Sequence, residues 1–142
     1  MEDFRVIIAG SRGFNNYNYL CERMDFLLKE KIKTHKIIII SGTATGADKT
    51  GERYAKEREF ECIQCSAEWD LHGKSAGYKR NEEMGIISDV AAIFWDGKSR
   101  GSRHMSDIMN KLNKPCRIYV VNENDLLSLS PKKQLSISYQ HV

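Results

Sequence analysis

The segment from Lys36 to Ser41, KIIIIS, constrains the fold more than any other part of this sequence. It places four isoleucines in a row and shows no alternation of apolar and polar positions. A strand that exposes one face to water alternates in this way, whereas a strand covered on both faces is apolar throughout. The segment is therefore typical of a central strand in a parallel sheet.

Other short apolar runs have the composition of strands, and amphipathic patterns separate them. The predicted strands are Phe4–Ala9, Lys36–Ser41, Glu61–Ala67, Val90–Trp95 and Cys116–Val121. The predicted helices run from the cap residues Asn15–Asn18 to about Lys33, over Lys49–Glu59 with Ala55 facing inward, from Ser75 through Tyr78, Met84, Ile86 and Ile87, and over Ser99–Asn113 with Met105, Ile108, Met109 and Leu112 on one side. This alternation predicts an α/β fold, an open parallel sheet of about five strands with helices on both faces.

The length of 142 residues and the 41% of apolar residues predict one globular domain. Periodicity is lost after Asn122, apart from a turn of helix expected at Leu126-Leu127. We therefore expect a domain over residues 1–122 and a C-terminal extension over residues 123–142, which would bind a partner or form a tail.

Charge and hydropathy exclude several classes of protein. The net charge is +3 and the basic residues are scattered, which argues against a nucleic-acid-binding surface. No apolar stretch approaches the roughly 20 residues that cross a bilayer, and the N-terminus lacks the pattern of a secretory signal. We expect a cytoplasmic protein that does not bind membranes.

The cysteines and histidines do not form a metal-binding pattern. Cys62 and Cys65 form a CxxC, but no second pair completes a zinc site, and alternation along a strand directs the two sulfurs to opposite faces. A structural role is favoured over a redox or metal role. Among the histidines, His104 alone falls near the expected site, where it would contact a ligand or lie on a helix surface.

Three loops at the expected carboxyl edge of the sheet are rich in Gly, Ser, Thr and Arg. They span residues 10–13, 41–48 and 96–102. Ligands bind at this edge in open α/β sheets, and glycines next to helix N-termini favour phosphate. The alternative is that these glycines only form tight turns. Neither GxGxxG nor a Walker A motif is present, so a dinucleotide dehydrogenase and a P-loop NTPase are not supported.

Further candidate residues flank these loops, and each has two interpretations. Asp48 would either cap the helix that follows it or bind a ribose hydroxyl. Arg80 and Asn81 lie on one helix face with Gly77, which indicates either a ligand-facing surface or an exposed cationic helix. Trp69 would stack on a base or, as we expect, cover the core.

The motifs IAGSRGF, SGTATGADKTGERYA, AGYKRNEEM and WDGKSRGSRHM, in this order, resemble the SLOG superfamily of Rossmann-like domains. The resemblance covers residues 4–121 and is strongest to the branch of small proteins related to YspA and YpsA. It implies that a nucleotide or nucleotide-derived molecule binds at these loops. Carried over by position, the ligand-binding residues would be Gly10, Ser11, Arg12, Gly42, Thr43, Gly46, Asp48, Arg80, Asn81, Asp96, Ser99, Arg100, Gly101 and Ser102.

The superfamily includes LOG phosphoribohydrolases, single-strand-binding DprA proteins and sensors of cyclic or ADP-ribose-derived signals. LOG enzymes carry a PGGxGTxxE loop, but here Gly46 stands in the place of the catalytic glutamate and no PGG precedes Gly42. Asp48 or Glu82, or Asp96 in a third assignment, would then have to supply the carboxylate of an N-glycosidase.

The main functional hypothesis is a sensor or sequestering protein for a nucleotide-derived ligand, in a phage or bacterial defence setting. A LOG-like nucleotide hydrolase is the first alternative and DprA-like binding of single-stranded DNA is the second. We expect no cofactor and no bound metal, and the resemblance implies a homo-oligomer.

Overall fold

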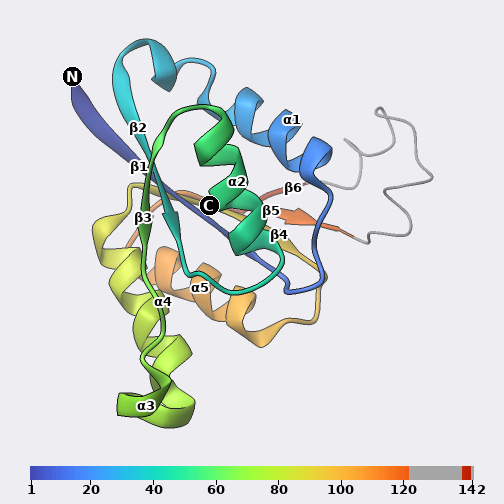
Figure 1. The fold of residues 1–142 in the computed structure, drawn as a ribbon, viewed down its shortest axis with the longest axis vertical. Coiled ribbons are helices and arrows are strands. Elements are labelled where there is room, and N and C mark those ends of the chain that lie inside the picture. The colour runs from blue at the N-terminus through green and yellow to red at the C-terminus, as the bar shows by residue number, and fades with distance from the viewer. Residues whose placement is uncertain (122–138, 142) are drawn as a thin grey trace.

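The computed structural model describes residues 1–121 and the backbone of residues 139–141. It forms one sheet in the order β3-β2-β1-β4-β5-β6 (Figure 1). The first five strands of the chain are parallel. They are β1 (Glu2–Gly10), β2 (His35–Ser41), β3 (Glu61–Gln64), β4 (Val90–Trp95) and β5 (Cys116–Val120). The predicted α/β class and the five parallel strands are therefore confirmed.

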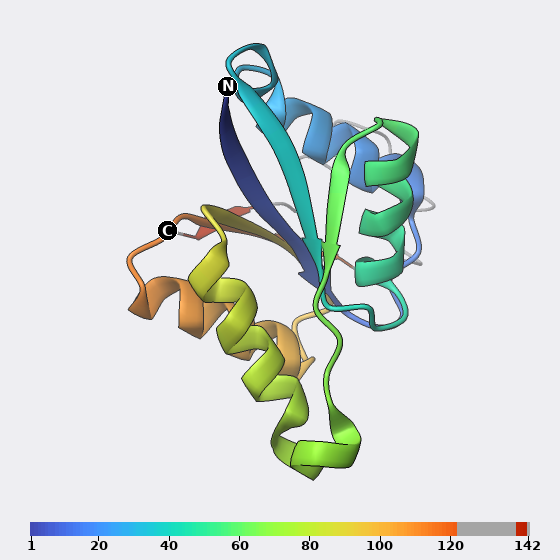
Figure 2. The same cartoon turned by 60° about the vertical axis from the view of Figure 1, so that its left-hand side comes forward.

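Helices cover both faces of the sheet, which explains why β2 is apolar on both sides. The helices are α1 (Tyr17–Leu28), α2 (Ala47–Glu57), α3 (Trp69–His72), α4 (Ala76–Ile87) and α5 (Arg100–Lys111), with 3₁₀ turns at Lys31–Lys33 and Gly73–Ser75. The helices α1 and α2 lie on one face, and α4 and α5 lie on the other (Figure 2). Ile39 of β2 packs in the α1/α2 core and Ile40 packs in the α4/α5 core.

Several boundaries differ from the sequence prediction. The first helix ends at Leu28 because its apolar stripe ends there, and residues 29–33 are exposed. The third strand ends at Gln64, after which the chain leaves the sheet and forms the unpredicted helix α3. Neither Ile86 nor Ile87 is buried, so the predicted apolar face of α4 is wrong at these positions. The residues of α4 that pack inward are Ala76, Asn81, Met84 and Gly85.

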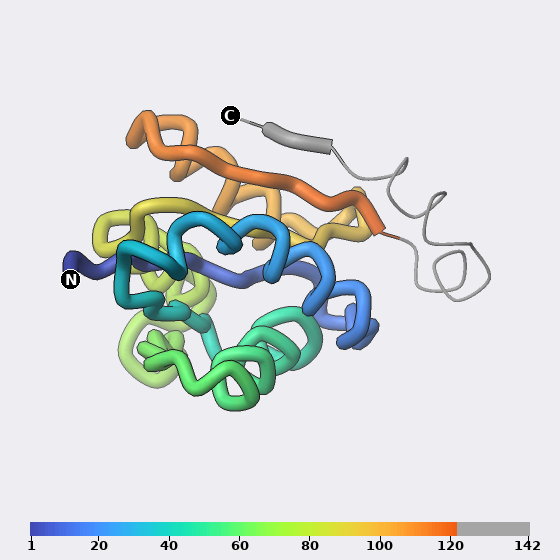
Figure 3. Tube along the Cα trace, turned by 90° about the horizontal axis from the view of Figure 1, so that it is seen from above, coloured from blue at the N-terminus to red at the C-terminus, as the bar shows by residue number. Residues whose placement is uncertain are grey.

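Tyr139–His141 forms β6, which pairs antiparallel with β5 at the edge of the sheet (Figure 1). The strand β5 is the last coloured stretch of the trace in Figure 3. This pairing was not predicted, because the alternation of strands and helices ends at β5. The predicted helical turn at Leu126-Leu127 lies outside the described residues. Within the residues described, no helix has the length and apolar character needed to span a bilayer.

Candidate functional site

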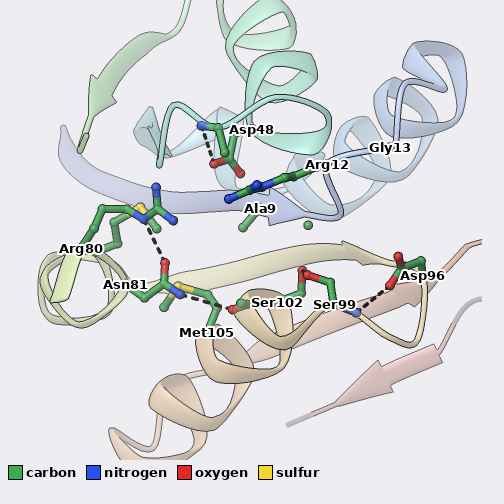
Figure 4. Close-up of a pocket in the computed structure, with 14 residues that line it drawn as sticks. Ala9, Arg12, Gly13, Asp48, Arg80, Asn81, Asp96, Ser99, Ser102 and Met105 are labelled. Atoms are coloured by element: carbon green, nitrogen blue, oxygen red, sulfur yellow. Dashed lines mark hydrogen bonds between the residues drawn. The ribbon is translucent and has the colours of Figure 1, made fainter. Parts of the chain in front are cut away.

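A cavity of about 390 Å³ lies at the carboxyl ends of β1 and β4, which are adjacent in the sheet (Figure 4). The chain leaves β1 toward the α1/α2 face and leaves β4 toward α5 on the opposite face, so a crevice opens between the two loops. Its lining residues are Ala9, Gly10, Arg12, Gly13, Ala44, Asp48, Arg80, Asn81, Met84, Asp96, Ser99, Gly101, Ser102 and Met105. The three predicted loops therefore converge.

Ser11 holds the three loops together. Its backbone N–H donates to the Phe94 carbonyl at 2.9 Å, and its own carbonyl accepts from the Ala47 N–H at 3.2 Å. Its hydroxyl accepts from the Asp96 N–H at 2.9 Å. Because Ser11 is buried and does not line the cavity, the structure gives it a scaffolding position behind the site.

Gly46 is required where the first and second loops meet. Its φ of 80° and ψ of −125° lie in a region that residues with a Cβ rarely adopt. A Cβ at this position would come within 2.3 Å of the Arg12 carbonyl oxygen. Gly46 therefore allows the loop before α2 to pack against the backbone of Arg12, although it does not line the cavity itself.

Two arginines bring positive charge to the cavity, one on each side in Figure 4. Arg12 is exposed, on the loop after β1. Arg80 extends from α4, and its Nη1 donates to the Gly42 carbonyl at 2.6 Å. Within residues 1–121, neither guanidinium forms an ion pair with a carboxylate. The cavity therefore offers two cations that an anion can neutralise.

Asn81 fixes the orientation of Arg80. Its Oδ1 accepts from Arg80 Nε at 3.1 Å, and its Nδ2 donates to the Gly101 carbonyl at 3.2 Å. The same Nδ2 lies 3.3 Å from His104 Nδ1. Asn81 is buried and connects α4 to the first turn of α5, so the amide sets the position of a cation rather than acting as a free ligand-binding group.

The N-terminus of α5 contributes unpaired backbone donors to the opposite wall. Ser99 is its N-cap residue, and no side chain caps the helix. Ser99, Gly101 and Ser102 line the cavity, so the first turn of α5 faces it. The free N–H groups and the positive end of the helix dipole favour a bound anion.

The carboxyl group of Asp96 accepts hydrogen bonds from the loop that precedes α5. Its Oδ1 accepts from the N–H groups of Lys98 and Ser99, each at 2.8 Å. Burial acts to raise the pKa of Asp96, but these hydrogen bonds outweigh it and the pKa lies below its usual value. Asp96 is therefore an ionised residue that shapes the loop.

The pKa of Asp48, unlike that of Asp96, is raised. Asp48 is buried at the start of α2, lines the cavity, and its Oδ2 accepts from the Ala44 N–H at 3.1 Å. Burial raises the pKa of Asp48 to about 6, although the Ala44 N–H and the nearby Arg80 act to lower it. The protonation state of this carboxyl group therefore changes as the pH passes about 6, rather than about 4 as for an exposed aspartate.

The remaining predicted residues lie around the cavity rather than in its lining. Gly42 and Thr43 line an adjoining cavity of about 420 Å³, which also contains Arg12 and Arg80. Arg100 is exposed and lines none of the described cavities. Glu82 lines a separate groove between α4 and α5, because it follows Asn81 on the helix and is turned by about 100° from it. The structure does not bring Glu82 to the carboxyl-edge site.

Two comparisons of sequence decide which family the chain belongs to. A family described as the YspA, cpYpsA-related SLOG family, YAcAr, matches residues 4–72. The Gene 61 protein of Mycobacterium phage D29 is 32% identical over 128 residues, covering 85% of this chain and 97% of the relative. The chain belongs to the YspA, cpYpsA-related SLOG family. The resemblance seen in the sequence motifs is thereby confirmed.

Two solved structures share the fold of this SLOG protein. DNA processing protein A from Helicobacter pylori, whose structure concerns single-stranded DNA binding, aligns with a TM-score of 0.62 and 23% identity over 92% of this chain and 73% of its own. The protein TM1055 aligns with a TM-score of 0.59 and 14% identity over 94% of this chain and 89% of its own. At these identities the comparison establishes the fold alone.

Sequence reasoning missed the apolar part of the SLOG cavity and the aromatic residue beside it. Ala9, Met84 and Met105 line the cavity. In the sequence, only their positions next to a predicted loop or within a predicted helix indicated that they could lie near the site. The expectation that Trp69 covers the core is wrong: its side chain is 53% exposed on α3. Trp69 lines two further cavities that share Arg12 and Arg80 with the main one.

The two cysteines of the CxxC lie on opposite faces of the sheet, as predicted. Cys62 packs against the α1/α2 core and Cys65 against the α4/α5 core. Burial raises the pKa of both thiols, which keeps them protonated. No group of three or more metal-ligating side chains is found in the described part of the chain.

Proposed function

We propose that the cavity binds the phosphate of a nucleotide or nucleotide-derived molecule, and that the protein captures or senses this ligand. One observation carries the proposal: Arg12, Arg80 and the uncapped first turn of α5 border the same cavity of about 390 Å³. A phosphate accepts hydrogen bonds from all three, and guanidinium groups match its geometry.

The composition of the lining favours capture over turnover. Of the residues described as lining the main cavity, none is a cysteine, histidine or lysine. Ser102 Oγ donates to Ser99 Oγ at 3.3 Å, and in the described part of the chain no histidine, lysine or arginine side chain hydrogen-bonds to either hydroxyl. Nucleophilic catalysis requires such a base within hydrogen-bonding reach.

A hydrolase that cleaves an N-glycosidic bond is the second candidate, and Asp48 supports it. A carboxyl group with a pKa of about 6 is suited to donate a proton to a leaving base near neutral pH. The other carboxyl of the lining, Asp96, is engaged by two backbone N–H groups. A hydrolase would therefore use Asp48 as its acid.

One assay separates these functions. The purified protein is incubated with nucleotides, ADP-ribose species and cyclic dinucleotides, and the filtrates are analysed by mass spectrometry before and after heat denaturation. A compound that disappears and returns intact on heating supports capture. A released base or ribose phosphate identifies a hydrolase, and loss of this product in Asp48→Asn would assign the acid. A filtrate that is unchanged for every compound contradicts both functions.

Single-stranded DNA remains an outcome to test because the Helicobacter pylori neighbour is described by that activity. A protein that binds DNA through several phosphates loses affinity steeply as salt increases. Binding of an oligonucleotide with such a salt dependence, and no binding of mononucleotides, would replace the small-molecule proposal.

The phage-encoded relative suggests a biological setting for capture. We propose that sequestration removes a nucleotide-derived signal of a bacterial defence response. The same filtrate assay, repeated with extracts of infected and uninfected cells, tests this: the retained compound should be present in the infected extract only, and a compound retained equally from both would contradict the proposed setting.

Replacing Arg12 with methionine is expected to weaken phosphate binding about 10- to 100-fold, the cost of a charge-assisted hydrogen bond. Methionine keeps an unbranched, flexible side chain but removes the charged guanidinium. The matched control is Arg100→Met, because Arg100 is also exposed and lies outside the described cavities. Titration calorimetry with the compound retained in the filtrate assay measures both. Equal losses in the two variants would point to general charge and contradict the assignment.

We also propose that the protein self-associates through α4 and α5. Ile86 is 67% exposed and Leu112 is 39% exposed, and both line the groove between these helices. The same groove carries Glu82 and Asp107 together with Lys111. In a two-fold interface a patch meets its own rotated copy, so a patch with both charges is able to pair with itself.

Replacing Ile86 with glutamate is therefore expected to convert a dimer into a monomer in sedimentation equilibrium at micromolar concentrations. Ile32→Glu is the control, since Ile32 is similarly exposed in the 3₁₀ turn after α1, away from the groove. A wild-type protein that sediments as a monomer would refute self-association.

A further inference from the structure

Trp69 occupies an unusual position for a large apolar side chain. It lies on the short helix α3, which projects beyond the carboxyl end of β3 below the sheet (Figure 2). Its side chain is 53% exposed, so the core does not account for its presence. An exposed tryptophan beside a charged cavity leaves an aromatic face on which a bound molecule can stack.

The surroundings of Trp69 connect it to the phosphate site. Arg12 and Arg80 line the main cavity, and both also line the two adjoining cavities that contain Trp69. These adjoining cavities have volumes of about 420 and 200 Å³. A ligand whose phosphate lies between the two arginines therefore extends directly to the indole ring.

Gly77 leaves open the space between the indole and a guanidinium. A Cβ at Gly77 would lie 3.5 Å from Trp69 Cη2 and 3.8 Å from Arg80 Nη2. The indole ring of Trp69 and the guanidinium of Arg80 therefore both lie beside Gly77, where α4 carries no side chain. Both groups are flat and stack on aromatic bases.

Hydroxyl groups line the same region. Thr43 and Ser66 line the cavity of about 420 Å³ beside Trp69, and their side-chain oxygens lie 3.1 Å apart. A hydroxyl offers one donor and two acceptor positions, so this pair keeps capacity for further hydrogen bonds. An aromatic surface next to such groups suits a nucleobase better than a sugar or a second phosphate.

We propose that Trp69, Gly77 and Arg80 form a nucleobase subsite, with the hydroxyls of Thr43 and Ser66 at its edge. This subsite rests on the proposed function, because it assumes that a phosphate binds at Arg12 and α5. It adds that the nucleobase, by stacking on Trp69, raises the affinity of the protein for its ligand. The ligand class is then a nucleotide with its base attached, and a free sugar phosphate binds more weakly.

The test compares adenosine 5′-monophosphate with ribose 5-phosphate, which has the same sugar and phosphate but no base. The wild-type protein is expected to bind the nucleotide about 5- to 150-fold more tightly, the range that stacking on one aromatic residue provides. Trp69→Leu should remove this advantage and leave the affinity for ribose 5-phosphate within about twofold. Trp69→Phe should keep most of it, because phenylalanine retains an aromatic face.

A second variant and a second signal test the same proposal without removing the tryptophan. Gly77→Leu fills the open space and should weaken nucleotide binding selectively. Stacking should also quench the emission of exposed Trp69, whereas Trp95, whose Nε1–H donates to the Ser99 carbonyl at 3.0 Å, should respond much less. The quench should therefore be absent in Trp69→Leu.

The outcomes distinguish the subsite from the phosphate site. If both compounds bind equally and Trp69→Leu changes neither affinity, the phosphate site stands and the nucleobase subsite is wrong. If neither compound binds the wild-type protein, the proposed function fails and the subsite fails with it. If Gly77→Leu weakens both compounds alike, the gap beside Trp69 does not select the base.

Discussion

Replacing Gly46 with alanine is expected to lower the free energy of unfolding by about 3 kcal/mol, the sum of backbone strain and a close contact. At this position φ is positive, and the added Cβ would lie within 2.4 Å of the carbonyl oxygens of both Ser11 and Arg12. The backbone of these loops cannot move away freely, because Ser11 also bonds to Phe94 and Asp96. Urea denaturation monitored by circular dichroism measures the loss.

Gly97→Ala is the matched control for this variant. Gly97 has φ of 84°, close to that of Gly46, but no atom lies within 4 Å of the position its Cβ would take. Gly97→Ala should lower the free energy of unfolding only by the cost of backbone strain, about 1–2 kcal/mol. Equal losses in the two variants would mean that the contact between the first two loops contributes nothing. A larger loss in Gly46→Ala should be accompanied by weaker phosphate binding, since Arg12 lies on the displaced loop.

Replacing Asp48 with asparagine is expected to stabilise the protein at neutral pH. In the folded protein the pKa of Asp48 is raised from 3.8 to about 6 by burial. Between about pH 4 and 6 the native state therefore holds a proton that the unfolded chain has lost, and stability declines over this interval as the pH rises. Above pH 7, a pKa difference of this size lowers the free energy of unfolding by about 3 kcal/mol. Asparagine imitates the protonated carboxyl and still accepts from the Ala44 N–H.

The pH dependence of this gain provides its own check. The two proteins should have equal stability at about pH 2–3, where Asp48 is protonated in both states, and should diverge up to about pH 7. Asp96→Asn is the control with the opposite sign: the pKa of Asp96 is lowered, so this variant should lose stability at neutral pH and recover it in acid. A gain for Asp48→Asn that does not vary with pH would show that burial of the charge is not its cause.

The strands and loops could be predicted because local composition determines them. Four adjacent isoleucines indicate a strand covered on both faces, and Val90–Trp95 ends at an Asp-Gly turn, as the structure shows. The convergence of the three loops followed from parallel strands alone. Local pattern therefore locates a site in this type of sheet even where no catalytic motif is present.

The same reasoning failed where packing between elements decides the outcome. Ile86 and Met84 are both apolar residues of α4, yet only Met84 faces the sheet, and the sequence does not state which side of a helix finds a partner. The helix α3 spans only four residues, too few for a periodic pattern. Trp69 was assigned to the core because most large apolar residues are buried.

The pairing of β1 with β4 has a consequence for synthesis of the protein. During synthesis Ser11 leaves the ribosome before its partners Phe94 and Asp96, which follow more than eighty residues later. A nascent chain therefore cannot close the cavity until α5 has been translated, and closing so long a loop carries an entropic cost. If the proposed ligand binds only the closed cavity, it favours completion of folding and protects finished chains from proteolysis.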